Sequence, residues 1–212
     1  TGQDCPLLIS HVIQRTEPGS DAQPRRRSAD SRQHALERVL VARVTTTGTF
    51  TRGELADAFA TFEQTVDDAA RRHDWDAWVE HYTDDVLYIE HAAGTMHGRD
   101  EVRNWIRRTM GTFPGSHMTH FPTLWHVIDE PTGRIICELD NPMRDPGDGT
   151  IISATNISII TYAGDGKWCR QEDVYNPLRF VQASIKWCRK AEELGTLDEE
   201  AAAWLAKFGG AA

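Results

Sequence analysis

The hydrophobic repeat of this chain changes once, and that change decides which folds are open to it. Up to Met110, apolar residues recur at spacings of three and four, a pattern typical of amphipathic helices. Beyond that point they alternate with polar residues, a pattern typical of half-buried strands. The strands predicted from the alternation cover Thr119–Asp129, Arg134–Met143, Ile151–Tyr162 and Lys167–Tyr175.

Short turn segments connect these four predicted strands. They span Asp129–Gly133, Asp145–Gly149 and Gly164–Gly166 and are rich in Gly, Pro and Asp. A parallel pair would need a connection of about a dozen residues or more, so neighbouring strands are expected to be antiparallel. Helices that precede a run of strands favour an α+β fold over a doubly wound sheet. We expect the twisted sheet and its helices to form a cone whose mouth holds a ligand.

Three helices are expected ahead of the strand run. Thr51 and Glu54 form a capping box at the start of the first helix, whose apolar stripe ends at Ala69. Asp74 is expected to cap a second helix and Asp100 a third. The residues expected on the inner face of the second helix are Trp75, Trp78, Val79 and Tyr82.

The predicted organisation has a leader, one folded domain and a C-terminal extension. Residues 1–50 mix Pro, Gly, Ser, Arg and Gln with little periodicity, so we expect a disordered or weakly helical leader. The domain is expected over 51–195, including a strand at Val86–His91 and a helix that begins at Pro177. A helical extension is expected over 196–212.

Charge and composition exclude several classes of function. The net charge is −9, and residues 51–212 carry 16 basic and 27 acidic residues, which argues against a nucleic-acid surface. No run of about 18 apolar residues is present, so no membrane-spanning helix is expected. The four cysteines are far apart and form no CxxC motif, so we expect reduced thiols and a cytoplasmic protein.

The histidines permit a metal interpretation that we do not favour. His117 and His120 have the spacing HxxH, but a zinc site needs three or four converging ligands. Pro114 and Pro122 flank the pair, which places it in a loop or at the start of a strand. We therefore expect neither a metal nor a cofactor.

Several short segments resemble the NTF2-like superfamily, in particular its SnoaL-like proteins of actinobacterial type. They are Asp74–Trp78, Tyr82–Asp85, Glu90-His91, Gly98–Asp100, Asp165–Trp168 and Glu172–Tyr175. The resemblance implies an NTF2-like cone with a small-molecule pocket, and homodimerisation through the sheet. The superfamily includes polyketide cyclases, ketosteroid isomerase, limonene-epoxide hydrolase and non-catalytic transport factors, so it does not imply one activity.

The resemblance transfers catalytic residues only in part. His91 falls where ketosteroid isomerase has its general base Asp, and Ser158 falls where that enzyme has the protonated Asp of its oxyanion hole. Glu138 and Asp140 resemble acidic positions of limonene-epoxide hydrolase, but Leu139 stands where that enzyme has an Arg. Neither catalytic set is intact, so neither activity is carried over.

The candidate catalytic residues are His91, Glu138 and Asp173. His91 ends a predicted strand, and its near-neutral pKa suits proton transfer, although it could equally bond a loop carbonyl. Glu138 lies inside an otherwise apolar strand. If its face is interior, it is a partner for His91, and if exterior, it is a solvated sheet residue. Asp173 is the other possible partner.

The candidate ligand-binding residues are polar groups on predicted strands and aromatic residues on predicted helices. Asn156 and Ser158 share one strand face, where they could hold a developing oxyanion or form an exposed ladder. Tyr175 shares a face with Asp173, but could instead anchor the last helix. The remaining candidates, which could line the cavity or belong to the core, are Trp78, Tyr82, Trp105 and His126.

Two functions therefore stay open from the sequence. The first is a cofactor-free acid–base enzyme, an isomerase, cyclase, dehydratase or hydrolase, that acts on a small hydrophobic oxygenated molecule. The second is a ligand-binding or assembly module of the same fold without chemistry.

Overall fold

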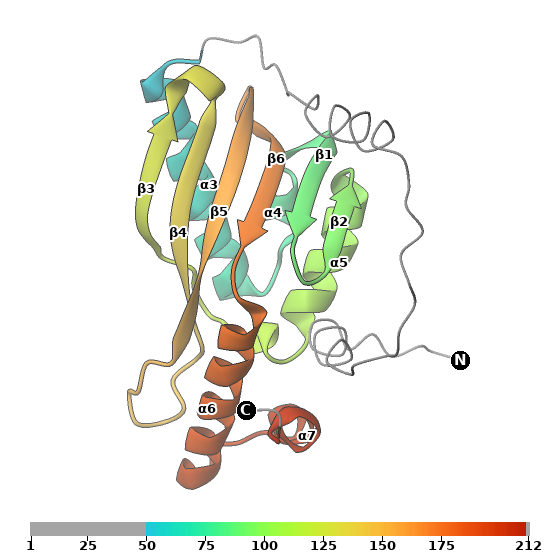
Figure 1. Cartoon of the computed structure of the whole chain (residues 1–212), viewed down its shortest axis with the longest axis vertical. Coiled ribbons are helices and arrows are strands. Elements are labelled where there is room, and N and C mark those ends of the chain that lie inside the picture. Colours follow the sequence, from blue (N-terminus) through green and yellow to red (C-terminus); the bar gives the residue numbers. More distant parts are fainter. Residues whose placement is uncertain (1–49, 211–212) are drawn as a thin grey trace, which may run out of the picture.

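A curved six-stranded sheet forms the centre of the molecule, with helices on one of its faces (Figure 1). The structure is a computed structural model that describes residues 50–210. The strand order is β2-β1-β6-β5-β4-β3. This arrangement confirms the predicted α+β class and the predicted NTF2-like architecture. The predicted leader lies outside the described residues except for Phe50.

Helix α3 (Arg52–Arg72) crosses the inner face of the sheet, the face that carries the helices. The Thr51 side chain accepts a hydrogen bond from the Glu54 amide at 3.2 Å, as the capping box predicted. The helix ends at His73, whose φ of 53° is in the left-handed region. Its apolar stripe buries Leu55, Phe59 and Phe62 against the sheet.

The next four elements differ in detail from the prediction. Helix α4 (Asp76–Val79) is a single turn, and strand β1 (Tyr82–Glu90) begins where the helix was expected to continue. Tyr82 is therefore a strand residue, and the prediction that it lies on the second helix is wrong. Strand β2 (Gly94–His97) follows, in a segment where no strand was predicted. Helix α5 (Arg99–Gly111) follows, and its N-cap is Gly98 rather than Asp100.

Four strands then form the predicted antiparallel run. They are β3 (Thr123–Asp129), β4 (Arg134–Pro142), β5 (Ser153–Gly164) and β6 (Lys167–Val174). Each pairs antiparallel with the next, as the short connections required. Strand β6 also pairs parallel with β1, which the intervening helices and strands permit because the connection is long.

A row of three arginines on α5 joins that helix to α4 and to the start of β1. Arg103 donates to Glu80 at 2.7 Å, and Arg99 donates to the same carboxylate at 2.7 Å. Arg107 donates to Asp76 at 2.8 Å. We refer to these ion pairs, on the surface of the molecule, as the arginine ladder.

Two helices follow the sheet at one end of the molecule (Figure 1). Helix α6 (Pro177–Leu194) has Asn176 as its N-cap and Pro177 at its first position, as predicted. Helix α7 (Glu199–Phe208) is capped by Asp198. Both pack over a second apolar cluster around Trp187. No helix within residues 50–210 has the length and apolar character needed to cross a membrane.

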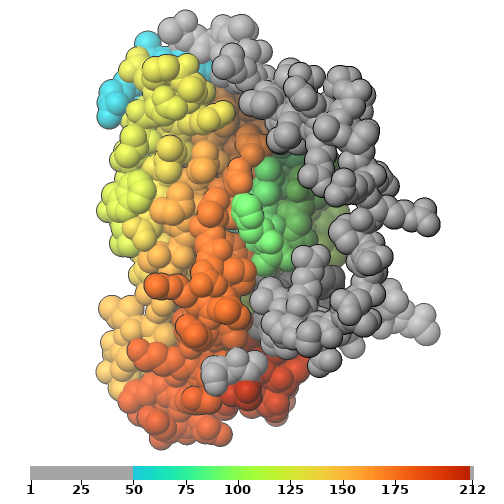
Figure 2. Space-filling view, in the orientation of Figure 1, coloured from blue at the N-terminus to red at the C-terminus, as the bar shows by residue number. Residues whose placement is uncertain are grey.

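The outer face of the sheet is the face turned away from α3, and Figure 2 shows it over β3 to β6 with no described helix covering it. Apolar side chains are exposed there, with Trp125 at 45% and Val127 at 53% of their full accessibility. The neighbouring strands add Ile136, Ile157 and Ile159, which are partly buried.

Candidate functional site

A chain of polar side chains crosses the inner face of the sheet, where an apolar core would be expected. Strand alternation places Gln171 with Asp173, and Asn156 with Ser158, on that face, since the members of each pair are two positions apart. We call them the interior network, and they are Tyr82, Tyr88, Gln171, Asp173, Ser158, Asn156 and Asn141. All except Asp173 are at most 9% exposed, and Asp173 is partly buried.

The Asp173 carboxylate is where the hydrogen bonds of the network converge. Ser158 Oγ donates to it at 2.6 Å, Tyr88 OH at 2.5 Å and Gln171 Nε2 at 3.0 Å. Burial raises the pKa of Asp173, while these three hydrogen bonds act in the opposite direction. The net result is a raised pKa of Asp173.

Two arms of hydrogen bonds lead to Asp173. On one side Tyr82 OH donates to Gln171 Oε1 at 2.5 Å, and Gln171 Nε2 also donates to Tyr88 OH at 3.1 Å. On the other side Asn141 Nδ2 donates to Asn156 Oδ1 at 2.9 Å, and Asn156 Nδ2 donates to Ser158 Oγ at 3.0 Å. Each arm therefore runs in one direction, from donor to acceptor, toward the carboxylate.

A second carboxyl group, Glu90, lies beside Asp173 on the neighbouring strand. The two residues are register partners of the parallel pair β1 and β6, so their side chains share the inner face. Glu90 is 4% exposed and accepts hydrogen bonds from Tyr175 OH and from the amides of Ala92 and Ala93. Burial raises the pKa of Glu90, and the negative charge of Asp173 raises it further.

Aromatic rings form the walls around these carboxyl groups. The rings of Tyr88 and Trp105 lie 4.9 Å apart, and those of Trp78 and Tyr82 lie 5.0 Å apart. Trp78 is 4% exposed, and its indole Nε1 has no hydrogen-bond partner among the described residues.

His91 and Glu138, the two residues placed first by sequence, lie outside this site. His91 is exposed, and its Nε2 lies 3.0 Å from Glu172 Oε1. Glu138 lies on the outer face, where its carboxylate accepts from Trp125 Nε1 at 2.6 Å. Two strands, β5 and β6, separate β4 from β1, so the predicted contact between His91 and Glu138 does not form.

The other sequence candidates divide between the network and its surroundings. Asp173, Asn156, Ser158 and Tyr82 are members of the network, and Tyr175 contacts Glu90. Trp78 and Trp105 are buried beside it. His126 is exposed on edge strand β3, where its ring lies 5.0 Å from that of Phe59.

Glu90, Tyr88 and Gln171 were missed by sequence reasoning, although the signal was present. On β1 the alternation of Val86, Tyr88 and Glu90 places all three on the buried face. His91 follows Glu90 directly and so belongs to the opposite side. A step of one residue along a strand reverses the face of the sheet, so His91 and Glu90 lie on opposite sides.

The HxxH segment does not bring its histidines together. His117 Nε2 lies 2.7 Å from Asp198 Oδ2, and burial lowers the pKa of His117. His120 is exposed and contacts Thr119. Within residues 50–210 no three His, Cys, Asp or Glu side chains are grouped in a way that could hold a metal ion.

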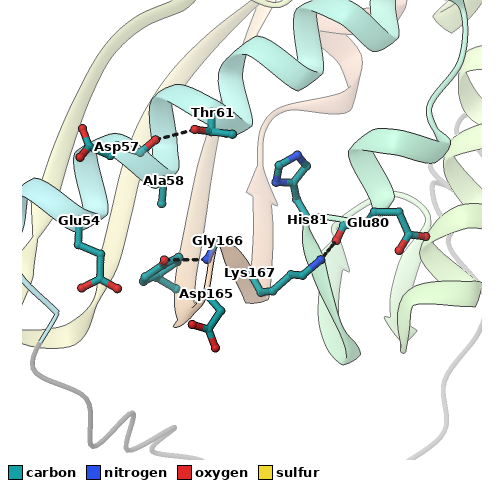
Figure 3. Close-up of a pocket in the computed structure, with 10 residues that line it drawn as sticks. Glu54, Asp57, Ala58, Thr61, Glu80, His81, Asp165, Gly166 and Lys167 are labelled. Carbon is teal, nitrogen blue, oxygen red and sulfur yellow. Dashed lines mark hydrogen bonds between the residues drawn. The ribbon is translucent and has the colours of Figure 1, made fainter.

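An open groove lies at the other end of the sheet, between α3 and the β5–β6 hairpin (Figure 3). Its acidic lining consists of Glu54, Asp57, Glu80 and Asp165. Lys167 crosses it to donate to the backbone carbonyl of Glu80, as Figure 3 shows. These four carboxylates are exposed, so water already solvates them. The buried carboxyls of the interior network are the better candidates for chemistry.

Comparison with known proteins agrees with this architecture. The family model of the SnoaL-like domain matches residues 62–171, just over half of the chain. No curated protein is a significant match. Among solved structures, 236 chains match, so the fold is too widespread to indicate one activity.

Two of these structures illustrate the likeness. A Bacillus subtilis protein provisionally named an isomerase has 17% identity and a TM-score of 0.50, over 63% of this chain and 95% of its own. An LEH-like epoxide hydrolase of M. tuberculosis has 12% identity and a TM-score of 0.50, over 69% of this chain and 95% of its own. At these identities the likeness concerns the fold alone.

Proposed function

The chain belongs to the SnoaL-like domain family, and from this premise we propose that it binds a small hydrophobic molecule beside Asp173 and transfers protons on it. Asp173 would act as the base, and Glu90 would be the second carboxyl of the site. The reaction would use no cofactor. Isomerisation, cyclisation, dehydration and hydrolysis are the reaction types that such a pair of carboxyls can serve.

The observation that carries this proposal is the position of Asp173. It is the common acceptor of two hydrogen-bonded arms on the inner face of the sheet. A base is most effective when its pKa lies near the working pH, and the pKa of Asp173 is raised in that direction.

The hydroxyl groups around Asp173 could stabilise the negative charge that forms on the substrate when it loses a proton. Ser158 and Tyr88 donate to the ionised carboxylate. When Asp173 takes a proton from the substrate, those hydroxyls lose an anionic acceptor and can turn to a developing oxyanion. The unpartnered Trp78 Nε1 is a further donor in the same wall.

A non-catalytic binding module is the second candidate, and the completeness of the network favours it. Every member of the interior network is satisfied by another member, and the aromatic rings of Tyr82, Tyr88 and Trp78 contact each other on the same side. A network that is complete without a ligand can serve rigidity alone.

We also infer that the outer face of the sheet pairs with a second copy of this chain. Trp125 and Val127 are exposed on edge strand β3, and Ile136 on β4 and Ile157 on β5 extend this apolar surface toward the centre of the sheet. Apolar faces of this kind are rare on monomers. Sedimentation of the wild type and of Val127→Glu tests this inference. A monomeric wild type would contradict it.

Proton transfer can be tested without knowing the substrate. We expect the protein to catalyse exchange of the α-protons of an aromatic ketone, such as α-tetralone, with deuterium from D₂O, followed by NMR. Asp173→Asn should reduce the exchange rate by about a hundredfold, the lower end of the usual contribution of a general base. His91→Gln is the matched control and should retain the rate.

The two candidates predict different results in this experiment. Exchange that is equal in the wild type and in Asp173→Asn would remove Asp173 as the base. Exchange lost in His91→Gln but retained in Asp173→Asn would restore the role that the sequence gave to His91. Binding of α-tetralone without any exchange would support the binding module.

A further inference from the structure

We propose that the ligand of this site carries a protonated amine, which lies between the carboxylates of Glu90 and Asp173. The inference rests on the proposed function, because it names the class of molecule that the same site takes. Its basis is a charge imbalance on the inner face of the sheet.

The partners of the two carboxyl groups are all electrically neutral. Asp173 accepts from Ser158, Tyr88 and Gln171. Glu90 accepts from the hydroxyl of Tyr175 and from two backbone amides. Neither carboxylate has a Lys, Arg or His partner at ion-pair distance within residues 50–210.

Elsewhere this chain supplies cations to carboxylates that are partly buried. Glu172 lies 2.7 Å from Arg170, and Asp198 lies 2.7 Å from Arg144. Glu172 is the direct neighbour of Asp173 in sequence, but it points to the outer face. The alternation of β6 therefore places the cationic Arg170 beside Glu172 on the outer side, and the inner pair of carboxyls has no cation at ion-pair distance within residues 50–210.

A buried carboxylate without a cation is costly, and a pair of them on adjacent strands is more so. Protonation removes part of this cost, and a positively charged ligand would remove it while forming hydrogen bonds. An ammonium group has three N–H donors and no acceptor, which suits a site where the protein hydroxyls already donate to Asp173.

Two further features fit a cationic molecule with an apolar body. Tyr88 and Tyr175 bond the two carboxyls, and the rings of Trp105 and Phe180 lie 4.9 Å and 4.8 Å from those of the two tyrosines. Aromatic faces attract cations. The net charge of −9 draws cations toward the molecule and repels anions.

The test compares two probes that share a carbon skeleton and differ in charge. Isothermal titration calorimetry of the full chain near neutral pH would measure the affinities of 2-phenylethylamine and of 2-phenylethanol, which is neutral. We expect the amine to bind about tenfold more tightly or better, since hydrogen bonds to charged groups are the stronger ones. Addition of salt should weaken the binding of the amine more than that of the alcohol.

Two matched double variants locate the effect. Glu90→Gln/Asp173→Asn removes both charges with little change in shape, and should lower the affinity for the amine to that for the alcohol. Glu80→Gln/Asp165→Asn removes two charges from the open groove, and should leave both affinities unchanged. Circular dichroism would verify that both variants are folded.

Several results would overturn the inference. They are equal affinities of the wild type for amine and alcohol, no binding of the amine at millimolar concentration, or loss of amine binding in the groove variant instead of the interior variant. Ketone exchange that depends on Asp173, with no preference for the amine, would reject this inference alone. Preference for the amine without exchange would reject the catalytic proposal alone.

Discussion

The arginine ladder and the interior site contain the same chemical group in opposite surroundings. In the ladder, the Arg107 guanidinium lowers the pKa of Asp76, and the Arg103 guanidinium lowers the pKa of Glu80. In the interior, burial raises the pKa values of Glu90 and Asp173. The Glu80 side chain of the ladder is 53% exposed, whereas Glu90 is 4% exposed.

The difference shows what each region contributes to the molecule. An exposed ion pair gains little stability, because water and salt screen it, and it mainly fixes the orientation of α5 against α4. A buried carboxyl that is held only by neutral donors keeps its charge at a cost, which a proton or a ligand can relieve. Chemistry is therefore expected where the carboxyls are unbalanced and not where they are paired.

The strongest way to sharpen this comparison is to remove one carboxyl from each region. Glu90→Ala leaves Tyr175 OH and the amides of Ala92 and Ala93 without their acceptor, so we expect a loss of about 2 kcal/mol in the free energy of unfolding. Glu80→Ala breaks only exposed ion pairs and should lose less than about 1 kcal/mol. Urea denaturation measures both losses. Equal losses would mean that burial does not separate the two regions.

Most of the fold could be predicted from the sequence because local patterns specify it. The capping box at Thr51, the Pro at position 177 and the Asp-Gly turn at 165–166 each act on a few neighbouring residues. The alternation of apolar and polar residues then predicted the strands β3 to β6. The prediction extended the one-turn helix α4 as far as Tyr82, because Trp75, Trp78 and Tyr82 fit a helical spacing by coincidence.

The site was predicted only in part, because it depends on which strands become neighbours. Asp173 and Ser158 were named from sequence, and they meet because β5 pairs with β6 in a register that no local pattern reveals. Glu90 reaches Asp173 only through the parallel pairing of β1 with β6. The outward direction of Glu138 could not be decided from sequence, because both faces of β4 carry apolar residues.

The next largest effect is the pH dependence of stability, which changes in opposite directions for the carboxyls of the two regions. The folded pKa values of Glu90 and Asp173 exceed their ordinary values of 4.5 and 3.8. Above those ordinary values the folded state therefore binds more protons than the unfolded state. Their contribution to stability therefore falls with rising pH. The carboxyls of Asp76 and Glu80 have lowered pKa values, so their contribution is lost only as pH falls below the ordinary range.

Urea denaturation between about pH 4.5 and 8 would measure this dependence. We expect the stability of the wild type to fall more steeply with rising pH than that of Glu90→Gln/Asp173→Asn, because the amides of the variant do not titrate. Glu80→Gln should follow the wild type in this range. A decline that survives in the interior double variant would assign it to other groups and break the comparison.

The smallest effect concerns salt. Arg103→Ala removes the central cation of the ladder, whose side chain is 21% exposed, and should cost less than about 1 kcal/mol at low ionic strength. That loss should nearly vanish in about 1 M NaCl, where the Debye length is about 3 Å. The effect of Asp173→Asn should not change with salt, because its partners are neutral and buried. A loss in Arg103→Ala that persists at high salt would show that the aliphatic stem of Arg103, rather than its charge, holds α5 in place.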